Sequence, residues 1–235
     1  MSIQYHHYKM MKQTHGVELA SDFKRIPELF DRNDFESFIN AIDKCPTYPK
    51  HHFWKLWMKA RDKAILCCLF FTGCRPKEIL ALKFTDYNYK DNSFFIDGSN
   101  NHSRKDRIVP ITIEMEKYLS EYLLFPKLSN TYLFPSYDNH SNHVNTNTWK
   151  RIFREKVLRP TGRYIKGTDK LMPRTRSYSM RCSYALRLIE NGVNPKNVMA
   201  SMGHSDWRSF MHYLTILSLK GENLNSVREA SSFVN

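Results

Sequence analysis

The spacing of apolar residues after position 32 predicts an amphipathic helix. Its apolar positions recur at intervals of three and four residues: Phe35, Phe38, Ile39 and Ile42. Asn33 and Glu36 match the capping-box pattern at the start of such a helix, which is expected to end near Lys44. The first thirty residues carry little pattern, so we expect ordered structure to begin at Asn33.

A second helix is predicted over residues 53–71, and its last two turns are apolar on every side. A helix that is hydrophobic all round is buried, so this segment is expected to form the centre of the fold. Thr72 and Gly73 end it, and Pro76 opens the next helix at a first-turn position, where its missing N–H costs nothing. Arg75 therefore lies at a rigid corner between two helices.

The rest of the pattern predicts one hairpin and further helices. Residues 93–97 and 107–111 are typical of two antiparallel strands, joined by a polar loop at 98–101. Helical periodicity returns in five segments: 112–125, 148–158, 178–191, 195–202 and 206–217. Residues 159–176 form a basic loop between two of these helices. The expected fold class is therefore mainly α with a small antiparallel β-hairpin or sheet (α+β).

The same pattern divides the chain into three parts. Residues 33–217 are expected to form one folded domain, preceded by an arm or truncated linker at 1–32 and followed by a C-terminal segment at 218–235. A chain of 235 residues suits one substantial domain. Such a domain buries enough surface to be stable without a disulfide or a metal ion.

Charge is the compositional feature that changes this picture most. The chain has 36 Lys and Arg against 23 Asp and Glu, so its net charge is +13. Positive residues recur beside aromatic and amide side chains from Lys50 to Arg208. This distribution is typical of nucleic-acid-binding domains, although a merely soluble basic protein has the same net charge. Charge therefore indicates a class of partner and leaves the chemistry open.

Membrane-spanning and secreted proteins are disfavoured. The longest apolar run, residues 64–71, is far shorter than the roughly 20 residues that cross a bilayer. Residues 1–16 contain no apolar stretch of the kind found in secretory signals. The five cysteines are odd in number and form no Cys-x-x-Cys pair. We therefore expect an intracellular protein, cytoplasmic or nucleoid-associated, with reduced core thiols, no membrane contact and no metal site.

Four residues are candidates for chemistry, and each has an ordinary structural explanation when it is taken alone. Arg75 has a salt-bridge partner three residues on, at Glu78, and Arg181 is placed to pair or cap on its own helix. His204 suits a satisfied turn histidine, and Tyr213 suits a helix core. Their order and spacing together carry more weight than any one of them.

These residues together resemble the tyrosine recombinases, the phage-integrase-like family. Residues 72–82, Thr-Gly-Cys-Arg-Pro-Lys-Glu-Ile-Leu-Ala-Leu, are similar to the family's first box, Thr-Gly-x-Arg-x-x-Glu. Further matches follow in order: the hairpin ending Arg107-Ile-Val-Pro110, Tyr178-Ser-Met-Arg181 in place of His-x-x-Arg, and Gly203-His204 with Tyr213 nine residues later. The resemblance covers about residues 34–217 and implies that the folded domain is catalytic.

The resemblance implies an enzyme that cleaves and rejoins DNA with no metal or other cofactor. Arg75 and Arg181 are the implied phosphate clamp, because guanidiniums are planar, permanently charged and bidentate. His204 is the implied third donor, and Glu78 of the first box supports the site. Tyr213 is the implied nucleophile; its ordinary pKa of about 10 makes it weak until neighbouring cations or a base stabilise the phenolate. Attack leaves a 3′-phosphotyrosine and a free 5′-hydroxyl.

The general acid departs from the family pattern. In the family a hairpin lysine protonates the leaving 5′-oxygen, but counting back from Pro110 that place is held by His102. Lys105 lies three residues on and reaches the site if the hairpin tip moves. If His102 donates the proton instead, activity falls as pH rises through its pKa, ordinarily about 6.5. A third interpretation is that both residues only touch backbone phosphate.

The second departure is Tyr178, which stands where the family's second box has histidine. A phenol hydrogen-bonds phosphate, but it is a weaker base than imidazole near neutral pH. We therefore expect slow turnover, since the two arginines are intact.

The basic character predicts double-stranded DNA as the partner. Phosphate contacts are expected from eight residues: Lys77, Arg104, Arg107, Lys150, Arg151, Arg174, Arg176 and Arg208. Each contact lowers log K by about 0.9 per decade of salt. The run Asn145-Thr-Asn-Thr148 either offers groups to base edges or caps a helix.

The resemblance also bears on assembly. Relatives carry a DNA-clamping domain of roughly eighty or more residues before the catalytic one, whereas about thirty residues precede Asn33 here. We therefore expect a catalytic domain nearly alone. It is expected to form a homotetramer on DNA, with residues 218–235 docking on a neighbouring protomer, and to be mostly monomeric off DNA.

The implied function is a site-specific recombinase, the integrase of a mobile element or virus. Two alternatives remain open. A nicking-closing enzyme similar to type IB topoisomerases uses similar residues and relaxes supercoiled DNA without a special site. A DNA-binding module that has lost catalysis through the changes at His102 and Tyr178 binds DNA and forms no covalent adduct.

Overall fold

A computed structural model describes residues 27–100, 105–163, 178–204, 210 and 213. Most of the predicted arm at 1–32, nearly all of the helix predicted at 206–217 and the whole segment 218–235 lie outside these residues. Phe210 and Tyr213 are described, and both have helical backbone.

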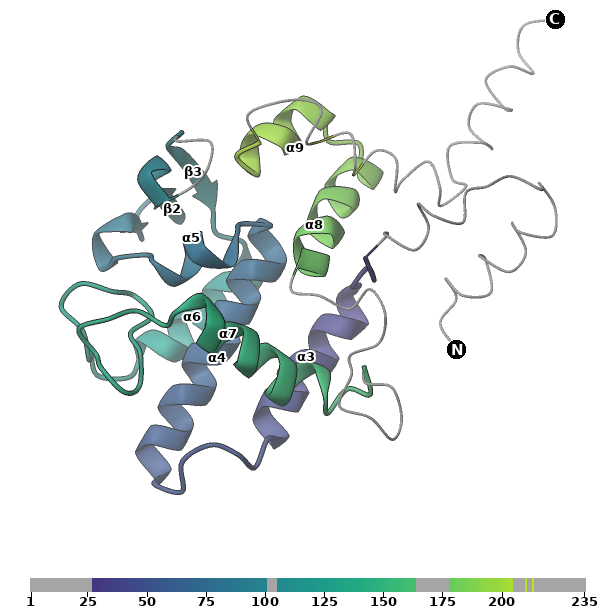
Figure 1. Cartoon of the computed structure of the whole chain (residues 1–235). Helices are drawn as coiled ribbons and strands as arrows, with labels where there is room; N and C mark the ends of the chain where they lie inside the picture. The colour runs from purple at the N-terminus through teal and green to yellow at the C-terminus, as the bar shows by residue number, and fades with distance from the viewer. Residues whose placement is uncertain (1–26, 101–104, 164–177, 205–209, 211–212, 214–235) are drawn as a thin grey trace, which may run out of the picture.

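Helix α4 (His52–Thr72) runs through the centre of the molecule (Figure 1). Helices α3 (Arg32–Lys44), α6 (Ile113–Leu123) and α8 (Tyr178–Glu190) pack around it. The side chains of α4 are buried without interruption from Trp57 to Phe70. The apolar last two turns predict burial of their part of this stretch, which also includes the charged residues Lys59, Arg61, Asp62 and Lys63. The predicted central helix is therefore confirmed.

A three-stranded antiparallel sheet lies beside these helices, with strands β1 (Tyr87–Asn88), β2 (Ser93–Ile96) and β3 (Arg107–Pro110) in that order. Phe94 of β2 pairs with Val109 of β3, and both are buried. On the other face of the pair, Phe95, Ile108 and Pro110 are exposed, whereas Ser93 at the start of β2 is buried, so the sheet meets the core mainly through one face. The predicted hairpin is confirmed, whereas β1 was missed because two residues carry no alternating pattern.

The start of α3 differs from the prediction. Its N-cap is Asp31, whose Oδ1 accepts a hydrogen bond from the amide of Asp34 at 2.9 Å, while the Asp31 amide donates to Asp34 Oδ2 at 3.0 Å. The capping box assigned to Asn33 and Glu36 was therefore wrong by two residues, because Asp31 and Asp34 have the same spacing. Phe30 also lies in the core, just before the predicted start of order.

The helix predicted at 148–158 begins earlier and has two parts. Helix α7 (Thr146–Ile152) starts at Asn145, whose side chain accepts from the amide of Thr148 at 2.8 Å. It continues as the π-helical segment η3 (Phe153–Leu158). The polar run before Trp149 thus caps a helix, one of the two interpretations that the sequence left open.

Shorter elements complete the described chain. These are α5 (Pro76–Leu80), α9 (Pro195–Ser201) and the 3₁₀ turns η1 (Phe84–Asp86) and η2 (Gly98–Asn100). Helix α9 contacts both α8 and β3, which closes the upper part of the molecule in Figure 1. The fold class predicted from the sequence, mainly α with a small antiparallel sheet, is confirmed.

All five cysteines are free and buried, as predicted for core thiols. In the described part of the chain, none of the helices is long and apolar enough to cross a bilayer.

Candidate active site

The corner between α4 and α5 holds the first arginine. Gly73 ends α4 in the left-handed conformation, with φ 61°, and its α-carbon faces the ring of Tyr184 on α8. Arg75 is the N-cap of α5, and its amide donates to Oε2 of Glu78 at 2.7 Å. Nη1 of Arg75 lies 3.4 Å from the other carboxylate oxygen. The side chain of Arg75 remains 33% exposed, so this guanidinium is held at the corner and still reaches solvent.

The second arginine ties three segments together. Arg181 is buried on α8, where Nη1 donates to the carbonyl of Gly73 and Nη2 donates to the carbonyl of Met202 at 2.8 Å. Nη2 also lies 2.9 Å from Nε2 of His204. The structure therefore brings Arg181 against the corner that carries Arg75, although the two residues are far apart in the sequence.

The histidine follows α9 and faces the same cluster. Because a guanidinium only donates, the contact with Arg181 makes Nε2 of His204 an acceptor and places the proton of the neutral imidazole on Nδ1. The ring of His204 packs edge-on against the ring of Tyr213, with centroids 5.4 Å apart. His204 and Tyr213 therefore lie together, as the sequence predicts.

The tyrosine is fully buried. Tyr213 has an exposed fraction of 0%, and its hydroxyl lies 2.7 Å from the hydroxyl of Tyr178. Burial raises the pKa of Tyr213, whereas the charge of Arg181 and the hydrogen bond with Tyr178 lower it, and the net pKa stays above the ordinary value. Burial and the adjacent Tyr213 also raise the pKa of Tyr178.

Arg107 occupies a different place from the one predicted. Instead of facing outward toward a DNA phosphate, its side chain is 8% exposed and donates to both carboxylate oxygens of Glu78, to Sγ of Cys74 at 3.3 Å and to the carbonyl of Ser201 at 2.9 Å. The reason is the buried carboxylate of Glu78, which needs a charged partner. A buried glutamate in the first box is the signal that points to such a partner.

Glu78 is ionised in this arrangement. Burial by itself would raise the pKa of Glu78, but the hydrogen bonds and charge of Arg107, the Arg75 amide and the Arg75 charge outweigh it, so the pKa is lowered. Gly203 lies against the guanidinium of Arg107: it has φ 67°, and a Cβ there would lie 2.8 Å from Nη1 of Arg107. The end of α9 therefore packs against the Arg107–Glu78 pair.

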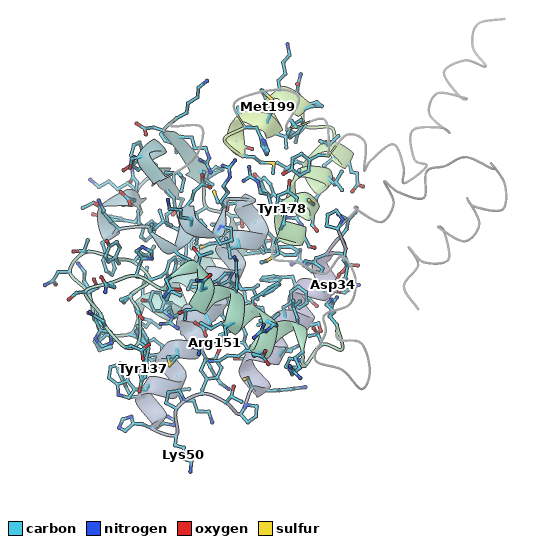
Figure 2. The ribbon with its side chains drawn as sticks, viewed as in Figure 1. Asp34, Lys50, Tyr137, Arg151, Tyr178 and Met199 are labelled. Carbon is cyan, nitrogen blue, oxygen red and sulfur yellow. The ribbon has the colours of Figure 1, made fainter. Side chains whose placement is uncertain are left out.

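Not every predicted residue joins this cluster. Tyr178, which Figure 2 labels at the start of α8, belongs to it through the contact of its hydroxyl with that of Tyr213. Lys105 is exposed two residues before Arg107, and its role stays a prediction. The predicted DNA contacts that are described and exposed are Lys77 on α5 and Lys150 and Arg151 on α7. Five predicted residues lie outside the described ranges: His102, Arg104, Arg174, Arg176 and Arg208.

The cluster has the functional groups that a phosphodiester reaction needs. Two guanidiniums and an imidazole can bind a phosphate anion, and a phenol can attack it. Over the residues that the structure describes, His, Cys, Asp and Glu side chains form no group of three that could hold a metal ion.

Comparison with known proteins places this arrangement in context. The model of the phage integrase family matches residues 30–218. A tyrosine recombinase of Thermosipho africanus is 25% identical over 193 residues, which cover 82% of this chain and 59% of that protein. The tyrosine recombinase XerC of Chlamydia caviae is 28% identical over 163 residues, which cover 68% of this chain and 48% of that protein. The chain thus spans less than two thirds of the length of these relatives.

Solved structures show the same fold. The crystal structure of XerA recombinase matches with a TM-score of 0.61 at 22% identity. The match covers 80% of this chain and 58% of the XerA chain. The structure of XerH site-specific recombinase bound to palindromic difH substrate, a post-cleavage complex, has a TM-score of 0.63 at 20% identity and covers 87% of this chain and 54% of its own.

Proposed function

Because the chain belongs to the phage integrase family, we propose that it cleaves and rejoins DNA at a specific site through a covalent bond between Tyr213 and a DNA phosphate. The observation that carries the proposal is the position of Arg181. It contacts the Gly73 carbonyl next to Arg75 and the ring of His204, which packs on Tyr213. One phosphate bound at Arg181 would therefore lie near Arg75, His204 and Tyr213.

The reaction is a reversible transesterification. The phenolic oxygen of Tyr213 attacks phosphorus as its proton leaves, the bond from phosphorus to the 5′-oxygen breaks, and that oxygen takes a proton from a general acid. The products are a 3′-phosphotyrosine and a 5′-hydroxyl. Attack on phosphorus by a 5′-hydroxyl re-forms the bond from phosphorus to the 5′-oxygen, breaks the bond to Tyr213 and returns a proton to its phenol. Lys105 and His102 are the two proposed general acids. Arg75, Arg181 and His204 stabilise the charge that develops on the nonbridging oxygens.

Charge balance supports this role for Arg75. Glu78 is neutralised by Arg107 at hydrogen-bond distances of 3.1 and 2.8 Å, while Arg75 makes the longer contact of 3.4 Å. Among Arg75, Arg107 and Glu78, two guanidiniums and one carboxylate leave a net charge of +1. The exposed part of that charge belongs to Arg75, which is therefore free to meet a phosphate.

The wider function follows from the family. We propose double-stranded DNA as the partner, an intracellular site of action, and a homotetramer on DNA with mostly monomer off it. The Tn1549 transposon integrase, in complex with a circular intermediate DNA and with transposon right end DNA, is among the similar solved structures, which supports the integrase of a mobile element or virus as the finer assignment.

The test is the covalent adduct itself. The full chain is incubated with short nicked duplexes whose central sequence is randomised, and DNA that stays attached to denatured protein is sequenced. We expect one enriched sequence, joined to the peptide that contains Tyr213, and no adduct with Tyr213→Phe. DNA binding without any adduct would contradict the proposal and favour a DNA-binding module. Adducts without sequence preference, together with relaxation of supercoiled plasmid, would favour a nicking-closing enzyme.

A further inference from the structure

Two phenols meet at the proposed nucleophile. Tyr178 is the first residue of α8 and 42% exposed, whereas Tyr213 is fully buried, and their hydroxyl oxygens are 2.7 Å apart. Their ring centroids are 6.3 Å apart, so the hydroxyls make the close contact and the rings do not stack tightly. A contact of this length is a good O–H···O hydrogen bond, in which one phenol donates and the other accepts.

The surroundings decide which phenol accepts. Among the residues that the structure describes, the charged or titratable groups around Tyr213 are Arg181 and Cys182 on α8, His204 after α9, and Tyr178 itself. Arg181 is the permanent charge among them, and a nearby cation favours negative charge on the oxygen of Tyr213. The neighbouring thiol carries no compensating charge, because burial raises the pKa of Cys182 to about 12. The more electron-rich oxygen accepts, so Tyr178 donates to Tyr213.

We propose that Tyr178 is a positioning residue for the nucleophile: its hydroxyl donates the hydrogen bond that holds the oxygen of Tyr213 beside Arg181 and stabilises the phenolate when it forms. The inference rests on the proposed function of Tyr213. Tyr178 keeps its own proton, since burial and the neighbouring phenol raise its pKa. It therefore supplies a hydrogen bond and takes no proton. This gives a role to the residue that stands where the family's second box has histidine.

The pairing is tested first without any DNA. Unfolding by urea is measured for the wild type, Tyr178→Phe, Tyr213→Phe and the double variant. Each variant lowers the folding equilibrium constant by some factor. If the two hydroxyls are hydrogen-bonded to each other, the factor for the double variant differs from the product of the two single factors by about 3- to 10-fold, as expected for one hydrogen bond. Multiplicative losses would overturn the pairing and the proposal with it.

The positioning role is tested by single-turnover cleavage of the enriched nicked duplex, measured against pH. Tyr178→Phe should cleave about 10- to 100-fold more slowly near neutral pH and recover part of its rate in alkali, because the phenolate has lost a donor. Tyr178→His, which restores a donor, should cleave within a few-fold of the wild type.

A matched control uses Tyr89→Phe, which removes a hydroxyl from a residue that is 71% exposed and outside the cluster. If Tyr178→Phe has the rate and pH profile of Tyr89→Phe, the positioning role is overturned while the proposed function stands. If the wild type forms no adduct that depends on Tyr213, the proposed function fails instead, and the urea measurements still judge the pair.

Discussion

Both carboxylate oxygens of Glu78 accept hydrogen bonds from the guanidinium of Arg107, at 3.1 and 2.8 Å. This bidentate pair joins strand β3 to helix α5, and the same guanidinium reaches the carbonyl of Ser201 at the end of α9. The pair is buried, so its geometry and its charge balance both matter for stability.

Arg107→Ala should destabilise the protein by about 3–5 kcal/mol, because it leaves the buried carboxylate of Glu78 without its main partner. Unfolding in urea measures this loss. The exposed Lys77→Ala is the control, expected to change stability by less than about 0.5 kcal/mol. If Arg107 instead contacted DNA phosphate, Arg107→Ala would leave stability intact and reduce the salt slope of binding by about 0.9.

Arg75→Ala and Arg181→Ala should differ in stability but agree in activity. Each should lower the rate of adduct formation by about 100- to 1000-fold, since each removes a donor from the phosphate. Arg181 is buried and holds the carbonyls of Gly73 and Met202, so its removal should also lower the melting temperature. Arg75→Ala should melt close to the wild type, because Arg107 still neutralises Glu78. Cleavage at the wild-type rate by either variant would show that the replaced arginine does not act on the phosphate.

Acid should weaken the protein partly through Glu78. The folded pKa of this carboxyl lies below its ordinary value of 4.5, so its contribution to stability is fully present above that pH and is lost as pH falls through the lowered pKa. Urea unfolding between about pH 6 and pH 3 should show this loss in the wild type but not in Glu78→Gln. Parallel curves for the two proteins would contradict the pKa shift.

Replacement by alanine should destabilise the protein more at Gly73 and Gly203 than at Gly162 and Gly192. All four have positive φ, but a Cβ at Gly73 would lie 2.3 Å from the ring of Tyr184, and one at Gly203 would lie 2.8 Å from Arg107. At Gly162 and Gly192 a Cβ meets nothing within 4 Å. Alanine at these two open positions should cost about 1–2 kcal/mol of unfolding free energy through the backbone alone. Alanine at Gly73 or Gly203 should add about 1–3 kcal/mol of overpacking.

The cap of α3 gives a simple check on the start of the fold. Asp31→Ala should lower the free energy of unfolding by about 1 kcal/mol, because the amide of Asp34 loses its acceptor. Asn33→Ala should be nearly neutral, since Asn33 is exposed inside the first turn. A larger loss of stability for Asn33→Ala than for Asp31→Ala would instead support the capping box of Asn33 and Glu36 that the sequence predicted.

The sequence predicted correctly those features of the fold that depend on a few neighbouring residues. The uniformly apolar turns of α4, the hairpin, and the proline that opens α5 all appear where the sequence placed them, because burial, strand pairing and first-turn geometry are encoded over a few residues. The start of α3 was misplaced because two capping pairs of equal spacing overlap there. Propensity alone does not choose between Asp31 and Asn33.

Long-range contacts were predicted only through the family resemblance. Arg75, Arg181, His204 and Tyr213 carry no local signal that they meet, and the resemblance supplied it. Arg107 shows the limit of this approach: a basic residue in a basic chain was expected to face DNA, whereas the buried Glu78 holds it inside. The hydroxyl contact between Tyr178 and Tyr213 depends on side-chain geometry that no spacing rule contains.

The three-way attachment of Arg107 has a consequence for biosynthesis. Its acceptors lie 33 residues before it, 29 residues before it and 94 residues after it, so the last of them leaves the ribosome long after the strand itself. Until Ser201 has been translated, the guanidinium of Arg107 lacks one of its acceptors, and the end of α9 cannot pack against it. A nascent chain therefore cannot complete the set of contacts around Arg107 before Ser201 has left the ribosome.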